Sequence, residues 1–191
     1  MKIFHLDCSV NDFEHSLTRK HSKMIADKLL SNNRNSEIYY IDLIKANIPF
    51  LNKEYQQAMF KPEKHRTDAD NAILSTFNIK PFHEADIYVL GVPGYLFNVP
   101  AIFKNWMEHT FRIDTTLDER WEGLLKGKKM FVVSAWGGIY TDTRVEKTYE
   151  NSIRSSFKIF GIEDITFFNI FNDRETKINN IYQIKEAIEA L

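Results

Sequence analysis

The stretch Ile87-Tyr88-Val89-Leu90-Gly91-Val92 decides the fold of this chain. Its residues are almost all apolar, which is typical of a strand in a parallel sheet that helices cover on both faces. Working outward, the sequence predicts four further strands, at residues 2–6, 37–43, 130–135 and 164–170. Helical spacing of apolar residues and capping residues predict helices at 17–30, within 65–83, and at 100–111, 145–160 and 175–191.

Strands and helices alternate along the chain. Such alternation favours a parallel sheet, because parallel strands need crossover connections and these are right-handed. We therefore predict a three-layer α/β sandwich with five parallel strands, formed by residues 1–191 as a single domain. Residues 44–64 have no clean period and contain Pro49 and Pro62, so we expect a long connection there, of the kind that is often functional.

The composition narrows the class of protein. Of the 191 residues, 43% are hydrophobic and 14% aromatic, enough for a sizeable core. The formal net charge of −1 argues against a nucleic-acid binder, whose affinity depends on a basic surface. The single cysteine, Cys8, excludes an internal disulfide and a cysteine-rich zinc site, and we expect no metal. Without a long apolar run or a signal peptide, we expect a cytoplasmic protein that does not bind membranes.

In open α/β sheets, ligands bind beyond the carboxyl ends of the strands, so residues 7–18, 93–99 and 135–142 should meet. Residues 9–18 match neither the dinucleotide-binding glycine pattern nor the Walker phosphate loop. They offer the hydroxyls of Ser9, Ser16 and Thr18 where a helix begins, and these could hold one phosphate. The alternative is that Ser16 only caps the helix.

The other two segments carry aromatic residues and glycines. Residues 93–100, Pro-Gly-Tyr-Leu-Phe-Asn-Val-Pro, place two aromatic rings in a loop, where they could hold a flat ligand or plug the core beneath. Residues 135–140, Ala-Trp-Gly-Gly-Ile-Tyr, place two glycines directly after a buried strand. Glycines let a ligand approach the backbone, although a tight turn would explain one of them. Together, the three segments indicate a flat ligand that bears a phosphate.

Residues 93–106 resemble the flavin loop of the flavodoxin-like NAD(P)H:quinone oxidoreductases, a family that includes the FMN-dependent NADH-azoreductases. Residues 135–138 are similar to the second flavin loop of that family, and Ser9 with residues 16–18 resembles its phosphate loop. The likeness runs from the first predicted strand to the last predicted helix. It implies a flavodoxin-like sheet with strand order 2-1-3-4-5.

The resemblance also implies a function. FMN, or FAD as the alternative, would take a hydride from NADH or NADPH and pass two electrons to a quinone or an azo acceptor. The protein would be a homodimer with one flavin per subunit at the interface. Tyr140 could hydrogen-bond the reduced flavin or the acceptor, or serve as an aromatic wall. The residues expected to bind the cofactor are Ser9, Ser16, Leu17, Thr18, Pro93, Gly94, Tyr95, Leu96, Phe97, Asn98, Ala135, Trp136, Gly137 and Gly138.

The sequence departs from the azoreductase pattern near the flavin. Azoreductases commonly have asparagine where Leu96 stands and a serine-arginine pair where Ala135 and Trp136 stand. The chain therefore has fewer polar side chains there, and backbone amides would make those contacts. Gly94 and Pro100 are closer to the quinone-reductase and drug-activity-modulator branches of the family.

Two rival functions share this topology. A flavodoxin-type electron carrier would lack its own NAD(P)H oxidase activity, and such carriers are usually strongly acidic, unlike this chain. A signalling receiver would need an aspartate after the third strand, where this chain has Pro93 and Gly94. His5 and Asp7 lie on one face of the first strand, where we expect a structural rather than a catalytic pair.

Overall fold

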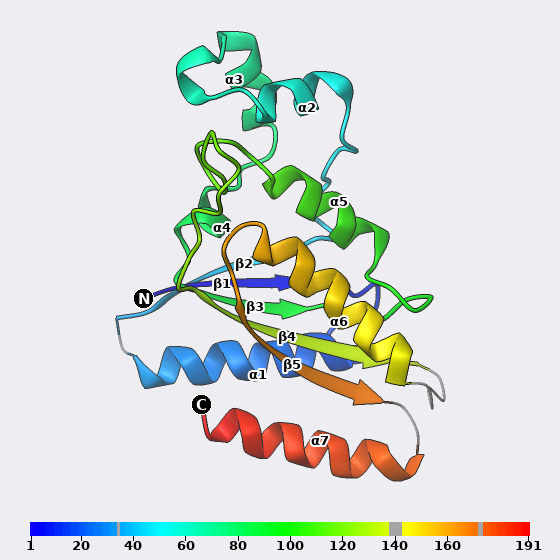
Figure 1. Ribbon diagram of the computed structural model, residues 1–191. Coiled ribbons are helices and arrows are strands. Elements are labelled where there is room, and N and C mark those ends of the chain that lie inside the picture. The colour runs from blue at the N-terminus through cyan, green and yellow to red at the C-terminus, as the bar shows by residue number, and fades with distance from the viewer. Residues whose placement is uncertain (34, 138–142, 172–173) are drawn as a thin grey trace.

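The computed structural model describes residues 1–33, 35–137, 143–171 and 174–191 (Figure 1). Within them, five parallel strands form one sheet in the order β2-β1-β3-β4-β5, which confirms the predicted topology. The strands are β1 (Lys2–Asp7), β2 (Glu37–Asp42), β3 (Ile87–Gly91), β4 (Lys129–Trp136) and β5 (Asp164–Phe171). The residues of β3 and β4 are almost entirely buried, as expected for central strands with helices on both faces.

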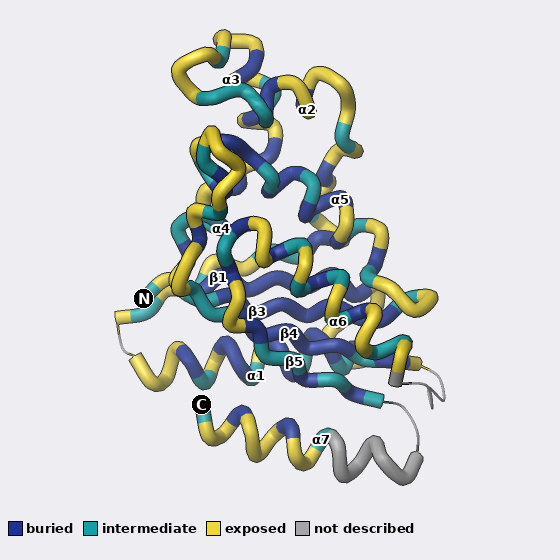
Figure 2. The backbone as a smooth tube through the Cα atoms, viewed as in Figure 1, coloured by how far each residue is buried: buried dark blue, intermediate teal, exposed yellow. Residues whose placement is uncertain are grey.

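Helices cover both faces of the sheet (Figure 1). On one side lie α1 (Leu17–Asn32) and α7 (Arg174–Glu189), and on the other lie α5 (Ala101–Thr110) and α6 (Thr143–Lys158). A separate apolar core fills each side, with Trp106 in one and Ile25 in the other. Figure 2 shows the buried strands between helices whose outer residues are exposed. The predicted three layers are therefore present.

The segment that follows β2 differs from the prediction. Residues 44–64 do not form an unstructured connection, because they contain α2 (Lys53–Met59) and the start of a short 3-10 helix (Glu63–His65). Asn52 caps α2, since its side chain accepts a hydrogen bond from the Tyr55 amide at 2.8 Å. A helix of this length is too short to show a clear period of apolar residues. The capping residue Asn52 was the sequence signal for it.

The region at 65–83 holds two helices rather than the single one expected. The first is α3 (Asp68–Ser75), which begins with a capping box between Thr67 and Asp70. The second is α4 (Lys80–Glu84), which has a proline in its first turn, a position that proline favours. Pro81 has no backbone N–H, so it could not continue a helix from α3. The region therefore divides into two separate helices. In Figure 1, α2 and α3 stand apart from the sheet.

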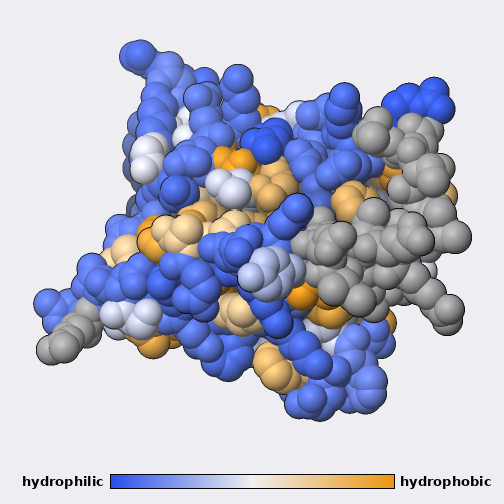
Figure 3. All heavy atoms as spheres, turned by 90° about the horizontal axis from the view of Figure 1, so that it is seen from below, coloured by the Kyte–Doolittle hydropathy of each residue, from blue (hydrophilic) through white to orange (hydrophobic). Residues whose placement is uncertain are grey.

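Figure 3 views the molecule from the side of α1 and α7. Hydrophilic side chains dominate this face, and hydrophobic ones show as smaller patches between them. This matches amphipathic helices that turn their apolar stripes towards the sheet. Among the described residues, none of the helices has both the length and the apolar character needed to cross a membrane.

Candidate functional site

The carboxyl ends of the strands meet at one edge of the sheet, where they continue into loop 1 (residues 8–16) and loop 2 (residues 92–100). A cavity of about 340 Å³ opens between these loops, the first turn of α1 and the end of β4. The predicted residues that line it are Ser9, Ser16, Leu17, Thr18, Pro93, Tyr95, Ala135, Trp136 and Gly137. Two further lining residues, Asn11 and His15, were not predicted from the sequence. Gly138 and Tyr140 lie outside the described residues.

The loop 1 end of the cavity suits an anion. The Ser16 hydroxyl caps α1 by accepting a hydrogen bond from the Arg19 amide at 3.3 Å, and it lies 3.1 Å from the Thr18 hydroxyl. Capping and ligand binding are compatible here, because both hydroxyls also line the cavity. Within the described part of the chain, the amides of Leu17 and Thr18 have no hydrogen-bond acceptor. Free amides at the positive end of a helix form a binding site for phosphate.

Loop 2 contains a strained turn. The backbone of Tyr95 pairs with that of Asn98 through two hydrogen bonds of 2.9 and 3.0 Å. Between them, Leu96 and Phe97 have φ angles of 46° and 66°, as in a type I′ turn, where asparagine and glycine are favoured. Both side chains project outward, with Leu96 91% and Phe97 52% exposed. Phe97 therefore does not plug the core.

Tyr95 connects the two loops. Its side chain is half-buried and lines the cavity, and its hydroxyl accepts a hydrogen bond from the Val10 amide at 3.3 Å. Leu96, Phe97 and Asn98 belong to the same turn but do not line this cavity. Loop 2 thus offers one aromatic ring at the cavity wall and an apolar tip beside it.

Trp136 lines the cavity, but most of its side chain is buried. Its side chain is only 2% exposed. The indole Nε1 donates to Ser134 Oγ at 2.9 Å, and the ring packs edge-on against Tyr149 at 4.9 Å. The indole therefore turns into the core and offers a ligand little surface. Gly137 comes next and is exposed, and among the described residues beyond its chain neighbours no atom would lie within 4 Å of a Cβ there.

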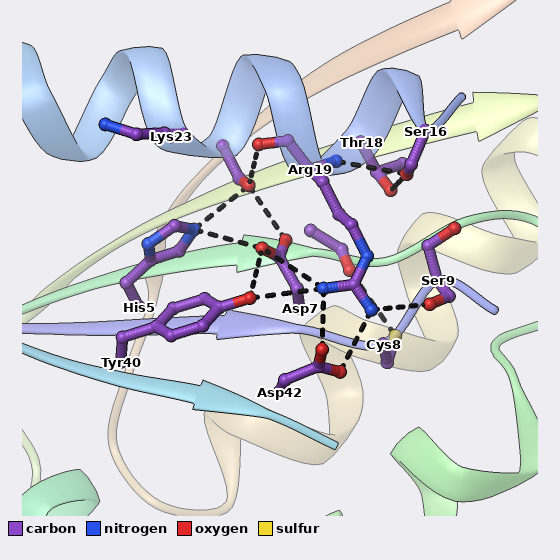
Figure 4. Close-up of polar contacts among 12 residues, drawn as sticks. His5, Asp7, Cys8, Ser9, Ser16, Thr18, Arg19, Lys23, Tyr40 and Asp42 are labelled. Atoms are coloured by element: carbon purple, nitrogen blue, oxygen red, sulfur yellow. Dashed lines mark hydrogen bonds and ion pairs between the residues drawn. The ribbon is translucent and has the colours of Figure 1, made fainter. Parts of the chain in front are cut away.

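A buried polar cluster lies behind loop 1 (Figure 4). Arg19 reaches from α1 to Asp42 at the end of β2, with two hydrogen bonds of 2.9 and 3.0 Å. Its guanidinium also donates to two backbone carbonyls of loop 1, those of Ser9 and Asn11. Arg19 and Asp42 were not predicted from the sequence as members of this cluster. The one signal available was an arginine in the first turn of a helix, where a positive charge is unfavourable.

His5 and Asp7 belong to the same cluster. Their Nε2 and Oδ2 atoms lie 3.6 Å apart, and neither residue lines the cavity, as expected of a structural pair. Ser22 and Tyr40 donate hydrogen bonds to the Asp7 carboxylate at 2.8 and 3.2 Å. Burial raises the pKa of Asp7 to about 6 and lowers the pKa of His5 to about 4.

The donors around the cavity fit a phosphorylated flavin. Hydroxyls and free amides at the helix end match a single phosphate, and a half-buried aromatic ring with an open glycine matches a flat ring system. The described residues contain no cluster of three or more His, Cys, Asp or Glu placed to hold a metal ion.

Known proteins resemble this chain along its whole length. A family described as flavodoxin-like fold matches residues 1–191. The chain is 31% identical to an FMN-dependent NADH:quinone oxidoreductase of Nostoc punctiforme, over 99% of this chain and 97% of that protein. It is 25% identical to an FMN-dependent NADH-azoreductase of Bacillus anthracis solved in complex with FMN, with a TM-score of 0.79 and coverage of 100% and 99%. The solved azoreductase AzrA shares the fold, with a TM-score of 0.84 at 17% identity over 100% of both chains.

Proposed function

Since the chain belongs to the flavodoxin-like fold family, and within it to the FMN-dependent NADH:quinone oxidoreductases, we propose that it is a flavin enzyme that oxidises NADH or NADPH and reduces a quinone or an azo compound. The observation that carries the proposal is the cavity at the carboxyl edge of the sheet. It joins hydroxyls and free helix amides at one end to loop 2 and Gly137 at the other.

FMN suits this cavity better than FAD, because loop 1 offers one cluster of phosphate donors. Ser9, Ser16 and Thr18 would hold the phosphate together with the amides of Leu17 and Thr18. Bound FMN would accept a hydride from the nicotinamide and supply two electrons to the acceptor. The work of the protein is to bind, orient and shield the ring.

Residues of loop 2 and β4 would orient the flavin ring. Pro93 and Tyr95 form one wall, and Phe97 extends it as an exposed aromatic side chain. The end of β4 also lines the cavity, and at Gly137 the absence of a side chain leaves room for a ring edge against the backbone. Leu96 has no polar atom to offer, so backbone amides would supply the donors there.

The proposal extends to assembly. We propose that residues 1–191 form one domain, that two copies make a homodimer in the cytoplasm, and that the partner completes the acceptor side of the pocket. Its support is the exposure of apolar side chains in loops 1 and 2, including Val10, Phe13, Leu96 and Phe97. Sedimentation velocity tests this part, and a fully active monomer would contradict it.

The absorbance spectrum of the purified protein tests the function. Flavin bands should appear with bound or added FMN, bleach under anaerobic NADH and return when a quinone is added. Flavin that NADH and NADPH cannot reduce would instead indicate an electron carrier. A protein that binds no FMN would overturn the flavin assignment itself.

A further inference from the structure

We propose that Arg19 is the positioning residue of the flavin phosphate site, because its guanidinium holds the backbone of loop 1 at Ser9 and Asn11, two residues that line the cavity. The inference rests on the proposed function, since it concerns the same FMN site. Arg19 belongs to the buried polar cluster of Figure 4 and does not line the cavity. It would act on the phosphate through the loop 1 backbone.

The Arg19 side chain is saturated with hydrogen bonds. Nε donates to Asn11 O at 2.9 Å, and Nη2 donates to Ser9 O at 2.6 Å. Nη1 donates to Tyr40 Oη at 3.1 Å, and the two Nη atoms form a fork on the Asp42 carboxylate. The five N–H groups of a guanidinium thus have five acceptors. Lysine has three donors and no planar fork, so it cannot reproduce this arrangement.

The geometry of the peptide bond turns these contacts into an orientation of loop 1. In a trans peptide, the N–H points away from the preceding C=O. Because the Ser9 carbonyl points to Arg19, the Val10 amide points to the opposite side, and there it donates to Tyr95 Oη at 3.3 Å. By the same geometry, the bond from Arg19 to Asn11 O turns the Asp12 amide away from Arg19. Arg19 thus fixes the backbone of loop 1 at Ser9 and Asn11, which line the cavity beside Ser16 and Thr18.

Charge alone does not explain the placement of Arg19. A cation in the first turn of a helix opposes the helix dipole, and Arg19 is only 8% exposed. Asp42 neutralises it at 2.9 Å, and Asp7 lies 4.0 Å from it. Its positive charge is therefore balanced by these carboxylates. Its contribution to the phosphate site is to hold the loop 1 backbone in place through its hydrogen bonds. Arg19→Lys keeps the charge but cannot reproduce this arrangement of hydrogen bonds.

The test compares two ligands that differ only in the phosphate. Dissociation constants for FMN and for riboflavin are measured by flavin fluorescence quenching with the full-length chain freed of flavin. We expect wild type to prefer FMN. Arg19→Lys should lose at least tenfold in FMN affinity while its riboflavin affinity changes less than twofold. Asp42→Asn, which keeps Arg19 but loosens the fork, should show a smaller loss of the same kind and serves if Arg19→Lys does not fold.

Arg112→Lys is the matched control. Arg112 is also 8% exposed, and it also donates to backbone carbonyls, those of Phe77 and His109, away from the cavity. Its variant should lower the melting temperature and leave the ratio of FMN to riboflavin affinity unchanged. Equal loss of both ligands in Arg19→Lys, or no loss, would overturn the positioning role, as would a wild type without preference for FMN. A wild type that binds neither flavin would reject the proposed function instead.

Discussion

Gly94 and Trp136 lie in such close contact that a Cβ on Gly94 would stand 2.6 Å from Cζ3 of the indole. The two residues also form a β-bridge, in which the Gly94 amide donates to the Ala135 carbonyl at 3.0 Å. Loop 2 is thereby seated directly on the last residue of β4. Loop 2 packs directly against the buried indole. This contact is possible only because Gly94 has no side chain.

Gly94→Ala should displace loop 2, because the new methyl group cannot share space with a fully packed indole. We expect a loss of roughly 1–3 kcal/mol of unfolding free energy, as in other overpacked sites, and at least a tenfold weaker affinity for FMN. Chemical denaturation and flavin titration measure the two effects. Combining the change with Trp136→Leu should restore part of the FMN affinity that Gly94→Ala loses. A Gly94→Ala protein with wild-type stability and affinity would contradict this contact.

Gly137→Ala should behave in the opposite way. Among the described residues, its Cβ would meet no atom within 4 Å apart from its chain neighbours, so the melting temperature should stay within about one degree of wild type. If the flavin ring lies against this backbone, the added methyl group should still weaken FMN binding by about tenfold. Thermal unfolding without flavin, followed by flavin titration, separates the two effects. Unchanged FMN affinity would remove Gly137 from the site.

The turn at Leu96 and Phe97 should be more stable with the residues that its backbone favours. Leu96→Asn combined with Phe97→Gly should raise the free energy of unfolding by about 1–2 kcal/mol, because both positions have positive φ. The same variant should bind FMN less tightly, since it lacks the exposed ring of Phe97. Leu124→Asn is the control, because Leu124 is also exposed but is not in the positive-φ region. It should leave both quantities unchanged, and a double variant less stable than wild type would disprove the strain.

Asp7 should make stability fall as the pH rises. Burial raises its pKa from 3.8 to about 6, so the folded state holds a proton that the unfolded chain releases. The resulting stabilisation is complete below about pH 4 and is lost as the pH rises through about 6. Its size is about 3 kcal/mol at 1.36 kcal/mol per pKa unit. Relative to Asp7→Asn, wild type should lose about this much between pH 4 and pH 7 in denaturant titrations.

His5 provides the control, because its pKa shift has the opposite effect on how stability depends on pH. Burial lowers its pKa to about 4, so its contribution is present above pH 6.5 and is lost as the pH falls through 4. His5→Gln should therefore make the fall in stability between pH 4 and pH 7 steeper than in wild type. Parallel pH profiles for wild type and Asp7→Asn would show that the carboxyl titrates normally.

Most of the fold could be predicted because the long elements carry strong periodic signals. The apolar run at β3 and the proline before α5 specify those elements locally. The three α-helices between β2 and β3 are only 5 to 8 residues long, and the signals of α2 and α3 are the caps Asn52 and Thr67 rather than a hydrophobic period. Periodicity therefore predicted one helix there in place of three α-helices.

The residues around the candidate site could be predicted only where topology gathers them. In open α/β sheets, ligands bind beyond the carboxyl ends of the strands. This rule correctly predicted that Ser9, Tyr95 and Gly137 lie around one cavity. It could not show that the Trp136 indole turns into the core, because the direction of a side chain at a strand end depends on its packing. It also missed the fork between Arg19 and Asp42, which are 23 residues apart in sequence and meet only because β2 pairs with β1.

The saturated guanidinium of Arg19 has a consequence for protein engineering. The acceptors that it satisfies come from two segments: two carbonyls in loop 1, and a phenol and a carboxylate on β2. Grafting loop 1 alone onto another parallel-sheet scaffold would leave its carbonyls without a donor, and the loop would relax. A successful transplant would need Arg19, Tyr40 and Asp42 to move with the loop as one unit.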